Sequence, residues 1–128
     1  MNLTELSKQI RFDNASKGFD PTEGGLDRYL LLAISEICEA QNEIRDGNEV
    51  NEIFYDADPN RWYKKPENQY LSKINIPGAK PCGFPVEIAD AIIRLLDICG
   101  KFDIDIEKVI NEKLAYNRSR PPKHGRKF

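Results

Sequence analysis

Hydrophobic residues recur every three or four positions over most of this chain, which is the period of an amphipathic α-helix. The pattern predicts four helices, over about residues 3–17, 26–46, 83–100 and 105–118. Local signals mark their ends. Gly47 is a good C-terminal cap for the second helix, Pro85 suits the first turn of the third, and Asp105 is a plausible N-cap for the fourth. We therefore predict an all-α fold, a four-helix bundle formed by one domain over residues 1–128.

Residues 48–82 break this pattern. A connection of about 35 residues is much longer than the usual link between two helices. It is rich in proline and aromatic residues, namely Pro59, Pro66, Pro77, Pro81, Phe54, Tyr55, Trp62, Tyr63 and Tyr70. The aromatic content indicates that this connector packs against something, as a lid, a short strand pair or a subunit contact.

Two pairs of carboxylates interrupt the apolar helices. Glu36 and Glu39 lie in S-E-I-C-E-A, and Glu87 and Asp90 lie in F-P-V-E-I-A-D. The i, i+3 spacing puts both members of a pair on one helix face. If the two helices face each other, the four carboxylates offer oxygen ligands to a hard cation such as Mg²⁺, and cations held in this way commonly serve phosphate chemistry. The spacing by itself fits equally well with the solvated faces of two amphipathic helices.

Apolar residues cover most of the circumference of the third helix, so we expect it to be largely buried. Its charged residues form one narrow stripe, Glu87, Asp90, Arg94 and Asp97. Arg94 and Asp97 are predicted to form an ion pair or a subunit contact. The apolar character of this helix favours at least a dimer.

The composition argues against several classes of function. The only histidine, His124, lies near the end of the chain, which disfavours Ser-His-Asp catalysis and a ferritin-like di-iron site. Cys38, Cys82 and Cys99 lack C-x-x-C spacing, so we expect neither a disulfide framework nor a zinc site, with Cys38 and Cys99 buried. No apolar run reaches the length of a membrane span and the start of the chain does not resemble a signal peptide, which predicts a cytoplasmic protein.

The net charge of −2 hides an uneven distribution. Six of the 19 Lys and Arg residues lie in residues 113–128, which contain no acid, leaving 13 against 21 Asp and Glu residues in 1–112. The basic end is compatible with a nucleic-acid-binding arm, but the acidic body opposes that interpretation. It is also compatible with one anion site divided between metal-binding acids and phosphate-binding bases.

Four segments of the chain form an ordered set. They are S-K-G-F before the second helix, L-L-A-I-S-E-I-C-E-A-Q-N-E-I-R-D-G within it, G-F-P-V-E-I-A-D-A-I-I-R-L-L-D in the third, and E-K-L-A-Y-N-R-S-R-P-P-K-H-G-R-K-F at the end. In this order the chain resembles the MazG-like nucleotide pyrophosphohydrolases, which are marked by E-x-x-E followed by E-x-x-D. The resemblance covers about three-quarters of the chain and leaves out the connector.

The resemblance implies an all-α enzyme that hydrolyses a nucleoside triphosphate to the monophosphate and pyrophosphate. It implies Mg²⁺, with Mn²⁺ as a possible substitute, and assembly as a dimer or tetramer. The metal ligands by this reading are Glu36, Glu39, Glu87 and Asp90, and Glu39 is the favoured acceptor of the proton from the attacking water.

The resemblance also places phosphate or sugar ligands in the fourth helix, at Lys113 and Asn117. These residues are i, i+4 and share a face, and Arg120 after them is suited to bidentate pairing with phosphate. Phe54, Trp62 and Tyr63 are candidates for stacking on the nucleobase, although packing of the connector is the commoner role for such residues. The base and sugar preference does not follow from the sequence.

A second hypothesis is a catalytically inactive helical module for oligomerisation or interaction. The aromatic connector and the apolar third helix would serve assembly alone in that case. It predicts no Mg²⁺ binding and no loss of stability on removal of the acids.

Overall fold

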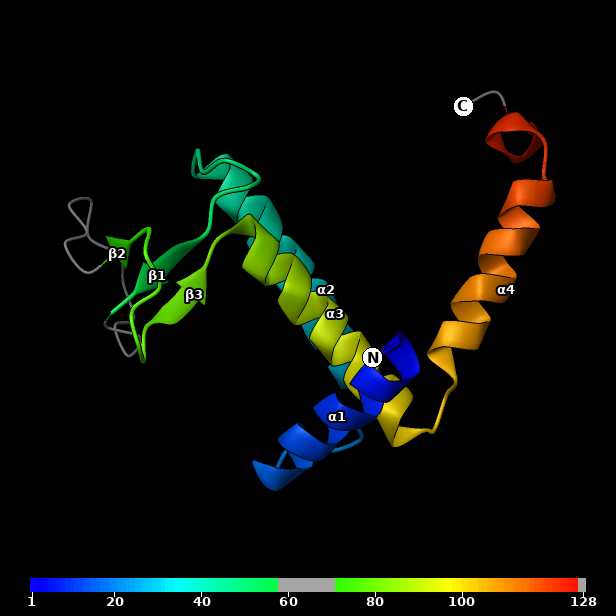
Figure 1. Ribbon diagram of the computed structural model, residues 1–128, viewed down its shortest axis with the longest axis horizontal. Coiled ribbons are helices and arrows are strands. Elements are labelled where there is room, and N and C mark those ends of the chain that lie inside the picture. Colours follow the sequence, from blue (N-terminus) through cyan, green and yellow to red (C-terminus); the bar gives the residue numbers. More distant parts are fainter. Residues whose placement is uncertain (58–70, 127–128) are drawn as a thin grey trace. The chain divides into compact units, whose positions relative to one another are not determined.

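The computed structural model describes residues 1–57 and 71–126 (Figure 1). Its elements are α1 (Leu3–Ser16), α2 (Leu26–Arg45), β1 (Phe54–Asp56), β2 (Leu71–Ser72), β3 (Lys80–Cys82), α3 (Phe84–Lys101), α4 (Ile106–Ser119) and a 3₁₀ turn, η1 (Pro122–Gly125). The prediction of a mostly helical protein with four helices is confirmed. The all-α prediction missed the three short strands. No helix in the described ranges combines the length and apolar content needed to cross a membrane.

The chain divides into two compact units. A terminal unit contains Met1–Gly25 and Leu95–Phe128, and a central unit contains Leu26–Arg94. Helix α3 begins in the central unit and its last turns belong to the terminal unit.

In the terminal unit, the starts of α1 and α4 are joined by a hydrogen-bond network. Asp105 caps α4 as predicted, because its side chain accepts from the Lys108 amide at 3.3 Å. The Thr4 hydroxyl donates to Asp105 at 2.7 Å and accepts from the Glu107 amide at 3.0 Å. These bonds satisfy backbone donors that a helix start leaves without intrahelical partners.

The last turns of α3 pack against α1 within the same unit. Gly100 permits this approach, since a Cβ there would lie 2.5 Å from the Ser7 carbonyl oxygen. One turn earlier, the fully buried Asp97 pairs with Arg11 at 2.9 Å and accepts a hydrogen bond from Asn14 at 2.9 Å. Asp97 is therefore an internal link between α1 and α3, where a buried carboxylate is tolerated because it is paired.

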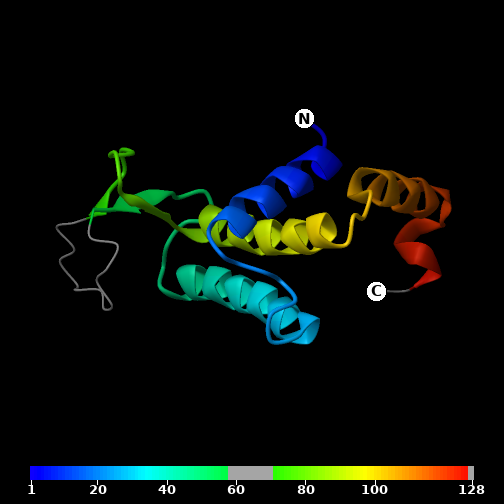
Figure 2. The same ribbon diagram turned by 90° about the horizontal axis from the view of Figure 1, so that it is seen from below.

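In the central unit, α2 and the first turns of α3 run side by side in opposite directions, as both views show (Figures 1 and 2). The connector between them forms an antiparallel sheet in the order β2-β1-β3, with Tyr55 opposite Ser72 on one side and opposite Pro81 on the other. The strand-pair interpretation of the connector is therefore confirmed in its described part. Phe54 is buried in this sheet, which supports packing rather than an exposed stacking role. Trp62 and Tyr63 lie outside the described residues.

A glycine fixes the junction between the sheet and α3. Gly83 has a φ of +118°, which side chains rarely tolerate, and a Cβ there would lie 2.3 Å from the carbonyl oxygen of Glu52. Gly47, which follows α2 as predicted, also has a positive φ of +88° but open space around it. Both positions therefore favour glycine through their positive φ, but only Gly83 is also closely packed against backbone.

Several expected burials are wrong. Large apolar side chains of α2 and α3 are exposed, namely Leu30, Leu31, Ile34, Ile37, Ile44, Ile88, Ile92, Ile93 and Leu95. The prediction that the third helix is largely buried is therefore wrong for the described structure, because Ile88, Ile92, Ile93 and Leu95 on this helix are exposed. Cys99 is buried as predicted, whereas Cys38 is exposed.

We expect Gly83→Ala to lower the free energy of unfolding by more than about 3 kcal/mol, because it adds a clash with backbone to an unfavourable φ. Gly47→Ala is the matched control, with an expected loss of about 1 kcal/mol from φ alone. Urea denaturation of both variants measures the difference. Equal losses would show that the close approach at Gly83 is absent.

Candidate metal-binding site

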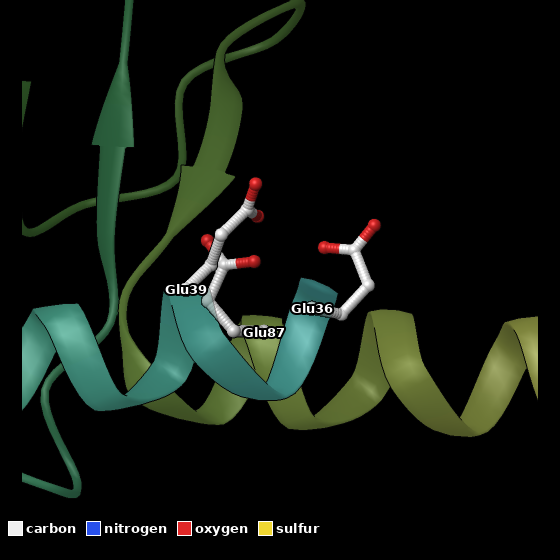
Figure 3. A group of neighbouring side chains, drawn as sticks. All are labelled: Glu36, Glu39 and Glu87. Atoms are coloured by element: carbon white, nitrogen blue, oxygen red, sulfur yellow. The ribbon is translucent and has the colours of Figure 1, made fainter. Parts of the chain in front are cut away.

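Three of the four predicted carboxylates come together where α2 faces α3. Glu36 and Glu39 project from successive turns of α2 and Glu87 projects from the first turn of α3 (Figure 3). One oxygen from each of these residues lies within 4.8 Å of the others. The i, i+3 spacing therefore places Glu36 and Glu39 near each other on α2, as predicted, and both lie near Glu87 on α3.

The buried stripe of α2 contains two glutamates beside a tyrosine and two alanines. Its members are Tyr29, Ala33, Glu36, Ala40 and Glu43, spaced alternately by four and three residues as on a helix that faces a partner. The small side chains of Ala33 and Ala40 are 3% and 2% exposed, and Glu36 is 8% exposed. Glu36 and Glu43 are therefore not on a solvated face of α2. Glu39, at the edge of the stripe, is exposed.

Mutual repulsion and burial raise the pKa values of the cluster. Burial is the largest cause of the rise of the Glu87 pKa to about 7, and the hydrogen bond and charge of Glu39 add to it. Burial also raises the pKa of Glu39, with a further rise from its contact with Glu36. The contact between Glu39 and Glu87 has opposite effects on the two carboxyls, because it raises the pKa of Glu87 and lowers that of Glu39. A cluster that holds a proton near neutral pH is one in which a cation would relieve repulsion.

Asp90 lies beside this group rather than within it. Burial raises its pKa first, and the negative charge of Glu36 raises it further, so the two carboxylates sense each other. The described structure does not bring an Asp90 oxygen into the three-residue group. Asp90 stays a predicted ligand.

A cation reaches Glu36 directly. The Nε and Nη2 atoms of Arg94 each lie 2.9 Å from Glu36 Oε1. The Arg94 guanidinium also lies over the ring of Tyr29, 5.6 Å from its centroid. Arg94 was predicted to pair within its own helix or at a subunit contact, and instead it joins α3 to α2, while Asp97 pairs with α1.

The predicted phosphate ligands belong to the terminal unit. Lys113 and Arg120 both lie over the ring of Tyr116, at 4.9 Å and 5.6 Å from its centroid. Lys113 is exposed, and Asn117 and Arg120 are half-buried. The described structure thus gathers two cations around one aromatic ring on α4. It does not place them relative to the carboxylates of the central unit.

Sequence reasoning missed two residues around the cluster and the partner of a third. Arg94 was placed on the charged stripe of the third helix, but its partner Glu36 on α2 was not predicted. Tyr29 precedes Glu36 by seven residues and so shares its face. Lys80, on β3, lowers the pKa values of Glu39 and Asp90 through its charge. No spacing rule could find Lys80, because the fold of the connector sets its position.

The donor set fits a hard divalent cation. All the ligand atoms are carboxylate oxygens, which Mg²⁺ prefers. Two or three such ligands leave the remaining coordination positions of Mg²⁺ to water or phosphate. Oxygens around Mg²⁺ are separated by roughly 3 to 4 Å, given metal–oxygen distances of about 2.1 Å. The three carboxylates would have to draw in by roughly one ångström, which flexible glutamates achieve by small rotations.

Comparison of the chain with protein-family models, with curated proteins and with solved structures finds no match.

The metal-free protein should become less stable as the pH rises through neutrality. The carboxyl of Glu87 has a pKa of about 7 in the folded state against an ordinary value of 4.5. The folded state therefore binds this proton more tightly than the unfolded state, and its contribution to stability is complete below about pH 4.5 and is lost as the pH passes 7. Urea denaturation in a chelator between about pH 5 and 8 measures the trend.

Glu87→Gln keeps a hydrogen-bonding side chain but cannot ionise, so its stability should depend less on pH over this range. Parallel profiles for the wild type and the variant would show that Glu87 does not hold the proton.

Proposed function

We propose that the protein is a metal-dependent hydrolase of phosphoric anhydrides. The observation that carries the proposal is the convergence of Glu36, Glu39 and Glu87 from two helices, with the acidic side of α2 buried. These side chains are held together at the expense of stability, since burial and neighbouring carboxylates raise the pKa of Glu87, and burial and Glu36 raise that of Glu39. Such strain is typical of sites that bind cations or do chemistry.

More narrowly, we assign it as a nucleotide pyrophosphohydrolase of the MazG-like kind. The substrate is a nucleoside triphosphate, either a ribo- or a deoxyribonucleotide, and the products are the monophosphate and pyrophosphate. This assignment is supported by the order E-x-x-E, E-x-x-D, then the Y-N-x-x-R-P segment, with the first two motifs on the facing helices α2 and α3. A role in removing unwanted nucleotides in the cytoplasm follows from the same resemblance.

Bound Mg²⁺ would neutralise phosphate charge and lower the pKa of a coordinated water. Glu36, Glu39 and Glu87 would hold it, with Asp90 as the fourth ligand. Glu39 is the member best placed to accept the proton of the attacking water, because it is exposed while Glu36 is buried. Lys113, Asn117 and Arg120 supply the cations and the amide that a triphosphate and its sugar need.

The active species is proposed to be a homodimer or homotetramer. Exposed apolar side chains on α2 and α3 support this, because contiguous apolar surface on a single chain usually marks an interface. The same surface also fits the alternative of a catalytically inactive assembly module. That alternative differs in its chemistry, because it requires no binding of Mg²⁺.

We expect the purified protein to release pyrophosphate from at least one nucleoside triphosphate in Mg²⁺. Glu39→Gln and Asp90→Asn should each lower kcat/KM by at least 100-fold, since each removes a charged ligand or base. Glu23→Gln, an exposed acid outside the cluster, is the control and should keep full activity. An assay over ribo- and deoxyribonucleoside triphosphates also identifies the base and sugar.

Pyrophosphate release that persists when all four carboxylates are replaced by amides would rule out this site. No release from any triphosphate, together with no heat of Mg²⁺ binding, would favour the assembly module.

Lys113→Gln should raise KM for the nucleotide by about 10-fold and leave Mg²⁺ binding unchanged, because it removes a phosphate contact and no metal ligand. The exposed Lys108 on the same helix provides the control, as Lys108→Gln. Steady-state kinetics measure the effect. Equal KM values for the two variants would place the triphosphate elsewhere.

A further inference from the structure

Arg94 shares a carboxylate with the metal-binding cluster. Both of its donors that reach Glu36, Nε and Nη2, contact the same oxygen, Oε1, at 2.9 Å. The side chain of Glu36 is 11% exposed and that of Arg94 is 31% exposed, so the pair is partly shielded from water. Glu36 is also one of the three residues that could hold a cation.

The position of Arg94 is fixed from two directions. Its own helix places it one turn beyond Asp90, and across from it the nearly buried ring of Tyr29 lies under the guanidinium. Tyr29 and Glu36 are seven residues apart on the buried stripe of α2, so both partners of Arg94 come from that stripe. A planar guanidinium suits this double contact better than an ammonium group.

We propose that Arg94 is a built-in counter-ion of the site, which occupies Glu36 when no metal is bound and competes with the metal for it. The inference rests on the proposed function. Its physical basis is that Glu36 serves two cations, and that a fixed positive charge beside a carboxylate repels a second cation from it. Arg94 thereby stabilises the packing of α3 against α2 in the metal-free protein. It also keeps the affinity of the protein for free Mg²⁺ low.

This arrangement has a consequence for the order of binding. A nucleoside triphosphate brings several negative charges, which offset the charge of Arg94. The metal therefore binds more tightly in the presence of nucleotide than in its absence, and Arg94 is a positioning residue that links the two events.

Calorimetric titration of Mg²⁺ into the full-length protein without nucleotide tests the proposal. Arg94→Gln should tighten Mg²⁺ binding by about 5- to 10-fold, the effect expected for one charge several ångströms away in a water-like medium. The same variant should melt at a lower temperature in a chelator, and Mg²⁺ should raise its melting temperature more than that of the wild type. Arg94→Lys keeps the charge and is the matched control, with a Kd within about twofold of the wild type.

The outcomes separate this inference from the proposed function. Suppose that the wild type binds Mg²⁺ and that Arg94→Gln binds it with equal or lower affinity. That result would overturn the counter-ion role alone, since loss of a purely structural contact lowers stability without raising the affinity for Mg²⁺. A wild type that binds no Mg²⁺ either with or without nucleotide would overturn both. An Arg94→Gln variant that stays unfolded at all Mg²⁺ concentrations would also overturn it, because the metal should replace the missing charge.

Discussion

Repulsion between carboxylates that are held together on the inner side of two facing helices is the constraint on which the central unit depends. Helix α2 buries Glu36 and Glu43 and exposes Leu31, Ile34 and Ile37, the reverse of an ordinary surface helix. Such a seam persists only if a proton, an arginine or a metal ion offsets the charge. Burial and neighbouring carboxylates raise the pKa of Glu87 to about 7, and Arg94 provides a permanent cation.

Because α2 buries glutamates and exposes apolar residues, we propose different roles for its two sides. Its acidic side forms the candidate metal site with α3, and its apolar side is left for a second copy of the chain in the proposed assembly. A sheet from the connector stands at the start of α3 and brings Lys80 into electrostatic contact with Glu39 and Asp90. The connector, which lies outside the resemblance to the MazG-like enzymes, therefore contributes charge to the site as well as linking two helices.

Much of the fold could be predicted because local signals determine it. The cap at Asp105, the glycine after α2 and the prolines after α4 mark helix ends through interactions with near neighbours in the chain. The acidic pairs could be predicted for the same reason, since i, i+3 spacing fixes the shared face. The sheet could not, because its pairing joins residues such as Tyr55 and Ser72, whose contact depends on the path of the chain between them.

The side of each amphipathic helix that faces the interior was harder to predict from the sequence. Apolar periodicity predicted that the third helix would be largely buried, but its Ile88, Ile92 and Ile93 are exposed. Periodicity shows which residues share a helix face, but it does not show which face meets a neighbour, because that depends on the packing of segments distant in the sequence. The role of Arg94 was hidden for a related reason, since its partner Glu36 lies 58 positions away in the sequence.

Crystallography with Mn²⁺, which scatters anomalously, would show whether the carboxylates bind a metal. We expect an anomalous peak between α2 and α3 within coordination distance of carboxylate oxygens from both helices. Crystals grown in saturating Mn²⁺ that show no such peak, with these side chains directed apart, would contradict it.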